Sequence, residues 1–514
     1  MRAYLASSIA VTCAAALALP LSLATATPAG AGPAAAASAS GNVNPAGAGL
    51  AGSTQSLPLE PLAPDGAPRG RGSGFAAPAE RGLTRREVRP FSLVGVVWDD
   101  PRTPLHGSVQ VRTRAAAGGA WSDWQDVETH NDEHGADPNT AEGRSAARRG
   151  STAPLWVGDS DGVEIRVHPE YRAAHALPAG LRLELVDPGP ETAGEREAEP
   201  YEATEAAGPT AATDAGAPAG QDARAHTATD ARALAAANAG AHTATDAGAP
   251  AGPGARTPAA TDARALAAGD ARALDRAGSR AAAVTDGTVL PALTRAQTLA
   301  TVPGTRAVAK APFIGPRPKI ITRKGWGADE KMRERGFVYT KTIKAAFIHH
   351  SATGNNYTCR QAPAVLRSIY RYHVKSLGWR DFGYNFAVDK CGNIYEGRAG
   401  GVGRAVMGAH TLGFNTNSMG IAVLGTYGGT TPPAAAVSAI ARLTAWKLGL
   451  YGVNPNGTTY LTSGGGNLYK KGKKVKFHVI AGHRDGFATE CPGGRLYNKL
   501  GTARSASAKY QGRR

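Results

Sequence analysis

Two long stretches of low-complexity sequence determine where this chain of 514 residues can fold. Residues 27–84 are rich in Ala, Gly, Pro and Ser, and residues 189–317 consist largely of Ala, Thr, Asp and Arg in short repeats. Such segments bury too little apolar surface to offset the loss of chain entropy, which predicts disorder in the first and a flexible linker or marginal helix in the second. Two folded domains are therefore expected, at residues 85–188 and 318–500, with a basic tail at 501–514.

The first 26 residues have the three-part organisation of a secretory signal peptide. Arg2 gives a positive start, residues 5–23 are mostly apolar, and residues 24–26 (Ala-Thr-Ala) are small enough for cleavage. A retained membrane anchor formed by the same residues is the alternative. After these residues, no segment reaches the length of a spanning helix. We therefore predict a secreted, extracellular protein that is associated with the cell wall and has no stable membrane span.

The net charge of +17 indicates an anionic partner. Nucleic acid, an anionic membrane surface and an acidic cell wall all fit such a charge. Export favours wall polymer over nucleic acid, so we expect an anionic wall polymer as a partner, no nucleic acid, and a monomeric chain. A lysine cluster within residues 470–476 is either a solvated hairpin or a contact with that polymer.

Alternation of apolar and polar residues predicts strands in the first folded segment. Residues 109–113, 163–167 and 181–185 alternate in this way, which is typical of half-buried strands. We therefore predict a small all-β domain at residues 85–188, to which the sequence assigns no role.

A histidine pair in this domain, His130 and His134, has a spacing of four residues. It departs from the zinc-protease pattern, in which Glu directly follows the first His. We therefore interpret residues 130–134 as a polar loop and not as a metal site.

The second folded segment mixes strand and helix patterns. Apolar residues 345–348 predict a buried strand, and residues 475–480 predict another. Thr358 and Gln361 form a capping box that opens a helix with apolar residues at spacings of three and four. The pattern predicts an α/β domain with a mixed central sheet flanked by helices.

Two histidines and a cysteine follow predicted strands of this domain. His349 lies directly after residues 345–348, His483 comes three residues after residue 480, and Cys491 lies eight residues further on (491 − 483 = 8). Taken singly, such residues are more often ordinary core or surface residues. Together, two imidazoles and a thiolate leave one position of tetrahedral Zn²⁺ open, as a catalytic site requires. On these residues alone, a catalytic zinc site in a surface groove and ordinary core residues both stay open.

Six blocks of this segment, taken together and in order, indicate a protein family more specifically than any one of them does alone. They are residues 347–353, 381–386, 394–398, 408–410, 415–422 and 482–493. In this order they resemble the peptidoglycan recognition proteins and their relatives, the type 2 N-acetylmuramoyl-L-alanine amidases. The resemblance covers residues 318–500. It implies a zinc-dependent hydrolase that cleaves the amide bond between N-acetylmuramic acid and L-alanine in bacterial peptidoglycan, with the muramyl peptide as its bound partner.

The resemblance implies a role for individual residues around the metal. The family's zinc ligands fall on His349, His483 and Cys491, and its catalytic residues fall on Tyr384 and Thr489. Members that only bind peptidoglycan typically lack the cysteine, so its presence favours an enzyme. A non-catalytic peptidoglycan-binding or wall-attachment protein is the alternative.

The resemblance also implies a groove for the muramyl peptide. Its residues fall on His373, His410 and Asn415, although a structural role of His373 within its helix stays open. Cytoplasmic relatives carry a carboxylate general base on the strand at residues 420–424, where this chain has no acid. This favours the type in which Tyr384 stabilises the developing negative charge. It leaves the proton acceptor unassigned, with Glu396 as the acid of a matched block.

The remaining cysteines are expected to form a disulfide. Cys13 leaves with the signal peptide, and Cys491 is assigned to zinc. Cys359 and Cys391 are then the two thiols left in an oxidising compartment, which predicts a bridge between them, with two buried thiols as the alternative.

Overall fold

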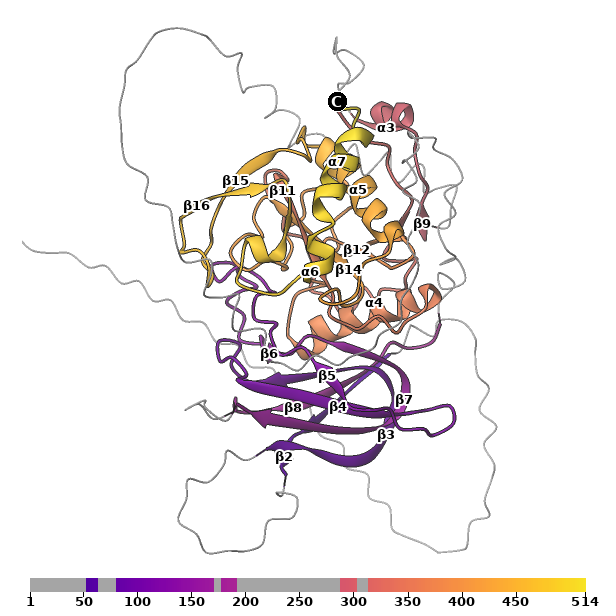
Figure 1. Ribbon diagram of the computed structural model, residues 1–514, viewed down its shortest axis with the longest axis vertical. Coiled ribbons are helices and arrows are strands. Elements are labelled where there is room, and N and C mark those ends of the chain that lie inside the picture. Colours follow the sequence, from indigo (N-terminus) through magenta and orange to yellow (C-terminus); the bar gives the residue numbers. More distant parts are fainter. Residues whose placement is uncertain (1–51, 63–79, 171–176, 192–286, 303–312) are drawn as a thin grey trace, which may run out of the picture. The chain divides into compact units, whose positions relative to one another are not determined.

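The computed structural model describes residues 52–62, 80–170, 177–191, 287–302 and 313–514, which lie in one compact unit, Gly49–Arg514 (Figure 1). The predicted signal peptide and most of the two low-complexity stretches lie outside these residues. Among the described helices, none combines the length and the apolar character that a membrane crossing needs.

The predicted all-β domain is confirmed as an antiparallel sheet of eight strands in the order β1-β8-β3-β7-β4-β5, with β2 and β6 also paired to β3. The strands are β1 (Ser53–Pro58), β2 (Glu60–Pro61), β3 (Arg81–Trp98), β4 (Gly107–Ala115), β5 (Gln125–Val127), β6 (Gly150–Ser151), β7 (Leu155–Pro169) and β8 (Arg182–Asp187). Register shifts along β3 mark bulges, which bend a strand.

The predicted disorder of residues 27–84 is wrong where the structure describes this stretch. Strand β1 pairs with β8 over all six of its residues, and β3 begins at Arg81. The physical reason is local burial, because Leu59 and Leu83 are only 2% and 5% exposed in the core of this sheet. In the sequence, these single apolar residues stand among Gly and Pro, so they form no recognisable strand pattern.

The second domain contains a seven-stranded mixed sheet in the order β17-β11-β14-β12-β13-β10-β9. Strand β11 pairs in parallel with β14 on one side and with β17 on the other. Strand β12 is parallel to β14, and β13 is antiparallel to β12. The strands are β9 (Val289–Leu290), β10 (Ile320–Ile321), β11 (Ala345–His350), β12 (Phe386–Val388), β13 (Ile394–Glu396), β14 (Ser418–Val423) and β17 (Ile480–Gly482). A separate hairpin consists of β15 (Thr458–Thr462) and β16 (Lys474–His478).

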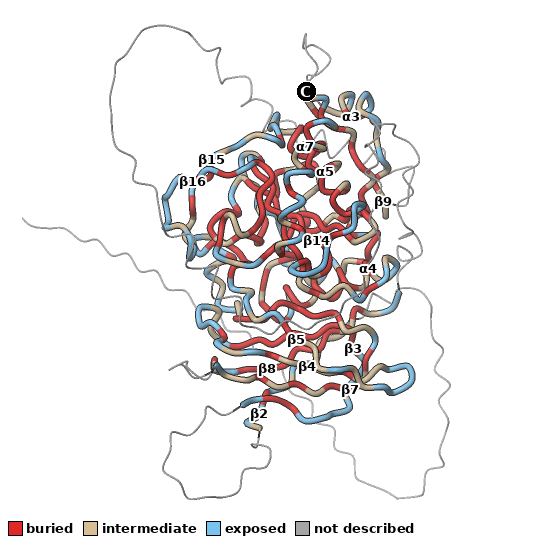
Figure 2. The backbone as a smooth tube through the Cα atoms, viewed as in Figure 1, coloured by how far each residue is buried: buried red, intermediate tan, exposed pale blue. Residues whose placement is uncertain are grey.

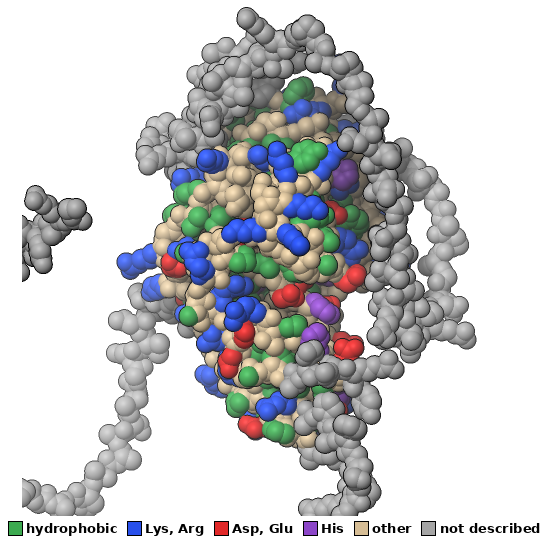
Figure 3. Space-filling model, turned by 90° about the vertical axis from the view of Figure 1, so that its left-hand side faces the viewer, with side chains coloured by type: hydrophobic (Ala, Val, Ile, Leu, Met, Phe, Trp, Pro, Cys, Tyr) green, Lys and Arg blue, Asp and Glu red, His purple; other side chains and the backbone are tan. Residues whose placement is uncertain are grey.

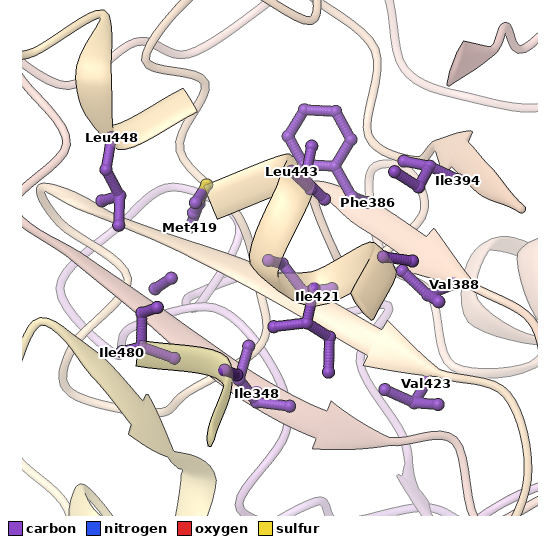
Figure 4. Close-up of a cluster of buried hydrophobic side chains, with 14 of the residues drawn as sticks. Ile348, Phe386, Val388, Ile394, Met419, Ile421, Val423, Leu443, Leu448 and Ile480 are labelled. Carbon is purple, nitrogen blue, oxygen red and sulfur yellow. The ribbon is translucent and has the colours of Figure 1, made fainter. Parts of the chain in front are cut away.

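Helices cover both faces of this sheet, as predicted. The α-helices are α3 (Arg295–Thr301), α4 (Ala362–Arg371), α5 (Ala434–Gly449), α6 (Gly494–Tyr497) and α7 (Leu500–Tyr510). Side chains of the sheet such as Ile348 and Ile421 pack against Leu443 of α5 (Figure 4). Helix α4 packs on the opposite face, and the most deeply buried backbone follows the sheet (Figure 2).

Two boundaries predicted for this domain are wrong. Strand β9 and helix α3 lie within residues 189–317, predicted as a linker; β9 pairs with β10, and Thr294 caps α3 with a complete capping box. The predicted basic tail at residues 501–514 forms most of α7. Its Ala503 is fully buried in the same core as α5, which explains why this stretch is ordered.

The long low-complexity stretch also predicts independent domains, but the two sheets share a core. Leu93 and Val97 of β3 point away from the first domain's own core and pack with Leu366 and Ile369 of α4. A five-residue π-turn, η5 (Tyr372–Ser376), continues α4, and its Tyr372 hydroxyl donates a hydrogen bond of 3.1 Å to the Thr152 carbonyl. The domains are therefore joined by buried apolar and polar contacts.

Candidate metal centre

The strand register brings the predicted ligands to one edge of the sheet. Ile348 of β11 lies opposite Gly482 of the parallel strand β17, so His349 and His483 leave neighbouring strands side by side. The His349 Nδ1 atom lies 3.8 Å from Cys491 Sγ. The structure thus brings together the three residues that the sequence predicts as ligands.

Strand pleating explains why His349 and not its neighbour takes this place. Successive side chains of a strand point to opposite faces, and His349 shares the face of Phe347, away from α5. The next residue, His350, instead accepts a 3.4 Å hydrogen bond from the Tyr427 amide. The alternation therefore selects the first histidine of the pair for the metal centre.

A fourth residue, His134, joins this group from the first domain. Nitrogen or sulfur atoms of His134, His349, His483 and Cys491 all lie within 4.8 Å of one another, and all four residues are buried. The His134 ring centroid lies 4.6 Å from that of His483. The interpretation of residues 130–134 as a polar loop is therefore wrong for His134, whereas His130 is exposed as expected.

The donor chemistry of the group fits a metal ion. Both ring nitrogens of His134 and His483 lack a hydrogen-bond partner among the described residues, which is rare for buried polar atoms. Burial holds the pKa values of His349 and His483 well below the usual range, which keeps them in the neutral form that binds metal. Burial also raises the pKa of the Cys491 thiol, so a thiolate here needs a cation beside it.

The other nitrogen of His349 is held by neighbouring side chains. Its Nε2 lies 3.3 Å from His410 Nδ1 and 3.4 Å from the Thr411 hydroxyl. Gly420 makes this approach feasible, because a Cβ atom there would lie 2.4 Å from the His410 ring. Such partners fix the ring orientation of a metal-binding histidine, so His410 lies behind the metal centre.

Tyr384 lies next to the metal centre. Its ring centroid is 5.2 Å from that of His349, and its side chain is buried. Burial, together with the nearby Cys491 and Glu133, holds the pKa of the Tyr384 hydroxyl well above its usual value. The hydroxyl therefore stays protonated at neutral pH and can donate a hydrogen bond.

Thr489 lies in the loop that carries the cysteine. Its hydroxyl accepts a 3.1 Å hydrogen bond from the Cys491 amide and donates one of 2.8 Å to Glu133. Burial raises the pKa of the Glu133 carboxyl to about 7. The acid considered from the sequence, Glu396, instead accepts a hydrogen bond from the Arg323 amide and is absent from the four-residue group.

The residues predicted to bind substrate are buried. His373 stacks on Trp379 with ring centroids 4.4 Å apart, and its Nδ1 accepts the Gly383 amide. These contacts support a structural role, and His373 also lines the cavity beside the metal centre, so its contact with substrate stays a prediction. Asn415 accepts the His410 amide through its oxygen and donates 2.9 Å and 2.7 Å hydrogen bonds to residues 135 and 137 of the first domain.

A cavity of about 630 Å³ adjoins the metal centre. Residues of both domains line it, among them Leu105, Asn131 and Glu133 of the first and Tyr384, Thr489 and Cys491 of the second. Its size falls within the range of small-molecule sites. The cavity therefore depends on the contact between the two domains.

The predicted disulfide is present between Cys359 and Cys391, whose Cα atoms are 6.1 Å apart. Cys491 is the one free cysteine among the described residues. The predicted bridge is thus confirmed, and Cys491 is left as the thiol that the sequence assigns to the metal.

The lysine cluster lies on the β15–β16 hairpin and the turn that joins its strands. All of its members are exposed, and they are Lys470, Lys471, Lys473, Lys474 and Lys476. Figure 3 shows Lys and Arg side chains spread over the upper part of this face of the molecule.

Comparison with known families divides the chain in two. Residues 339–494 match the N-acetylmuramoyl-L-alanine amidase family, and residues 45–216 match the family described as Rv3811 N-terminal galactose-binding domain-like. The second match covers the residues of β1 and β2, in agreement with the structure.

Individual relatives are similar to the C-terminal part. Peptidoglycan-recognition protein SC2 of Drosophila melanogaster is 32% identical over 185 residues, which are 36% of this chain and 85% of that protein. N-acetylmuramoyl-L-alanine amidase of Homo sapiens is 30% identical over 197 residues, 37% of this chain and 29% of that protein. The solved structure of peptidoglycan recognition protein LE in complex with tracheal cytotoxin is 30% identical, covers 36% of this chain and 92% of its own, and has a TM-score of 0.28.

Proposed function

This chain belongs to the family of peptidoglycan recognition proteins and N-acetylmuramoyl-L-alanine amidases, and from that premise we propose that it is a zinc-dependent amidase. The bond it hydrolyses joins N-acetylmuramic acid to L-alanine in bacterial peptidoglycan. The observation that carries the proposal is the convergence of His349, His483 and Cys491 beside Tyr384. A thiolate at this position completes three protein ligands and leaves one position of tetrahedral zinc open for catalysis.

His349, His483 and Cys491 would hold the ion. When bound, zinc supplies a Lewis acid that lowers the pKa of water and polarises the scissile carbonyl. His410 is a positioning residue, because it contacts the far side of the His349 ring at 3.3 Å and fixes its orientation.

Tyr384 would act on the substrate itself. Its protonated hydroxyl can donate to the amide oxygen, where negative charge develops as water attacks. A donor that is already oriented and shielded from water stabilises that charge without reorganisation. Thr489 would orient the substrate near Cys491, whose backbone amide donates a hydrogen bond to the Thr489 hydroxyl.

Two further proposals concern where the protein acts and which polymer it contacts besides its substrate. We propose that the protein is secreted and acts on the wall from outside, as the N-terminal 26 residues predict. The exposed lysines of the β15–β16 hairpin would contact anionic wall polymer by charge.

The experiment is the digestion of purified peptidoglycan, with mass spectrometry of the soluble products and quantification of new L-alanine amino termini. Because His134 also faces the metal centre, the assay uses the full chain and its His134→Ala variant, each with and without a chelator. New L-alanine amino termini that vanish with chelator and return with zinc support the proposal. Their absence from both proteins over prolonged incubation refutes it and leaves peptidoglycan binding as the function.

A further inference from the structure

We propose that the first domain is a built-in inhibitor of the metal centre, with His134 as the fourth metal ligand and residues 133–142 as a plug in the substrate groove. The proposal rests on the proposed function and names its regulation. The segment from Glu128 to Arg149 connects β5 to β6 and crosses from the first domain onto the second.

The first argument is the number of ligands. Zinc with three protein ligands keeps its fourth position for water or substrate, whereas four protein ligands close a tetrahedral site. His134 reaches the group from a different domain, is 8% exposed, and makes no hydrogen bond through either ring nitrogen among the described residues. Its nearest charged neighbour is Glu133, whose Oε1 lies 3.8 Å from the His134 Nδ1 atom. As a fourth ligand, His134 would remove the open position that hydrolysis needs.

The second argument is the occupation of groove residues. The side-chain amide of Asn415 donates to the Gly135 carbonyl and to the Asp137 carboxylate, which also accepts the Gly413 amide at 2.8 Å. The Glu133 carbonyl accepts the Leu412 amide at 3.0 Å. Backbone and carboxylate groups of the plug therefore use donors along the loop that the sequence predicts to contact the muramyl peptide.

The third argument is a buried charge pair that anchors the far end of the plug. The two carboxylate oxygens of Glu142 accept hydrogen bonds of 2.8 Å from the two terminal nitrogens of Arg398, and the side chains are only 3% and 7% exposed. The Arg380 amide also donates to Glu142. A bidentate pair of this kind fixes orientation, and its separation leaves a buried charge without a partner. The plug is consequently held at its metal end and at its far end.

A competing role for the same residues is catalysis, with the first domain completing the active site around the adjoining cavity. The two roles predict opposite effects of His134 removal on the rate of hydrolysis. If His134 inhibits, its removal increases hydrolysis; if it takes part in the reaction, its removal abolishes hydrolysis. We favour the inhibitory role, because four protein ligands would close a tetrahedral site.

The experiment begins with the unmodified full chain and does not depend on hydrolysis. The protein is loaded with Co²⁺ in place of zinc, and its visible absorption spectrum is titrated with azide. A centre closed by four protein ligands leaves the spectrum unchanged, whereas the His134→Ala variant changes its spectrum as azide binds. An azide response of the unmodified protein equal to that of the variant would overturn the proposal.

The activity arm compares variants in the peptidoglycan digestion. His134→Ala and Glu142→Gln are each expected to increase the rate at least tenfold, through loss of the ligand and loss of the anchor. His168→Ala is the matched control, because this first-domain histidine contacts Glu80, does not line the cavity beside the metal centre and should leave the rate unchanged. A rate that falls in His134→Ala while circular dichroism is unchanged overturns the inhibitor. If His134→Ala does not fold, the Glu142→Gln variant and the azide titration of the unmodified chain still decide the question.

The two proposals fail in different ways. If no protein hydrolyses peptidoglycan but the azide titration separates wild type from His134→Ala, the amidase assignment is wrong and the fourth ligand is right. If hydrolysis is present and His134→Ala does not accelerate it, the amidase is right and the inhibitor is wrong.

Discussion

Replacement of Gly95 by alanine should weaken the contact between the two domains, because this glycine of β3 lies directly against Tyr372 of η5. A Cβ atom at Gly95 would lie 2.4 Å from the Tyr372 hydroxyl and 2.7 Å from a carbon of its ring. Tyr372 is fully buried, so its ring has no free space into which it can move. In Gly95→Ala, the Tyr372 side chain therefore has to move away from β3, or β3 and η5 have to separate.

The magnitude follows from two contributions. Overpacking of a buried site costs roughly 1–3 kcal/mol, and loss of the Tyr372 hydrogen bond to Thr152 adds about 0.5–1.5 kcal/mol. We expect a decrease of about 1.5–4.5 kcal/mol in the free energy of unfolding, as the sum of these two ranges. Urea denaturation followed by tryptophan fluorescence measures it. Gly428→Ala is the control, because its Cβ would meet nothing within 4 Å.

A double-mutant cycle tests the physical cause. Tyr372→Phe removes the hydroxyl that the new Cβ would strike, so Gly95→Ala should cost less in the Tyr372→Phe background than in wild type. Strictly additive effects, or a change below about 0.5 kcal/mol for Gly95→Ala alone, would be typical of an uncoupled surface site. Either result would refute the interface as described.

Three further predictions concern the second domain. Cys491→Ser, made in the His134→Ala background, should lower the zinc content measured by atomic absorption and abolish hydrolysis, while far-ultraviolet circular dichroism stays unchanged; activity equal to that of His134→Ala would contradict the ligand assignment. Tyr384→Phe, made in the His134→Ala background, should reduce turnover by about 10²–10³ with zinc still bound, and a drop below about threefold would show that another donor acts in the reaction. Thiol counting on denatured, metal-free protein should find one free thiol, whereas three would contradict the Cys359–Cys391 bridge. Closing this loop of 32 residues should stabilise the domain by roughly 3–4 kcal/mol relative to the reduced form.

The sequence predicted the three metal ligands in the second domain because local patterns determine their positions. A short apolar run places His349 at the end of β11, and a second one carries the chain to His483. The parallel pairing of β11 and β17 then makes them neighbours. These relations depend on strands within one domain, and the matched blocks contain both residues.

His134 could not be identified in the same way. Its closest sequence neighbours, Asn131 to Glu133, are polar, which is typical of a solvated loop. Its burial comes from docking against a surface more than 200 positions away in the sequence, a relation that no local period encodes. The remaining signal is chemical, since Glu133 and His134 add an acid and a ligand to a loop, but the same residues are common in exposed loops.

The short strands at the domain edges were missed for a related reason. Strand β1 contains few apolar residues, and β9 is apolar but only two residues long. The neighbours of both are rich in Gly, Pro, Ala and Thr. They are strands because β8 and β10 offer free edges for backbone hydrogen bonds. A pairing partner therefore determines their conformation more than their own side chains do.

The π-turn η5 explains how the interdomain contact and the groove can respond to each other. Its first and last residues bind the first domain, since Tyr372 donates to Thr152 and Ser376 donates a 2.8 Å hydrogen bond to the buried Glu184. Between them, His373 turns the other way, stacks on Trp379 and has its ring centroid 5.9 Å from that of Tyr384. π-turns within helices are rare and occur often at functional sites. Five consecutive residues thus contact the inhibitory domain and the wall of the metal centre at the same time, so withdrawal of the first domain would remove the contacts that fix the position of this wall.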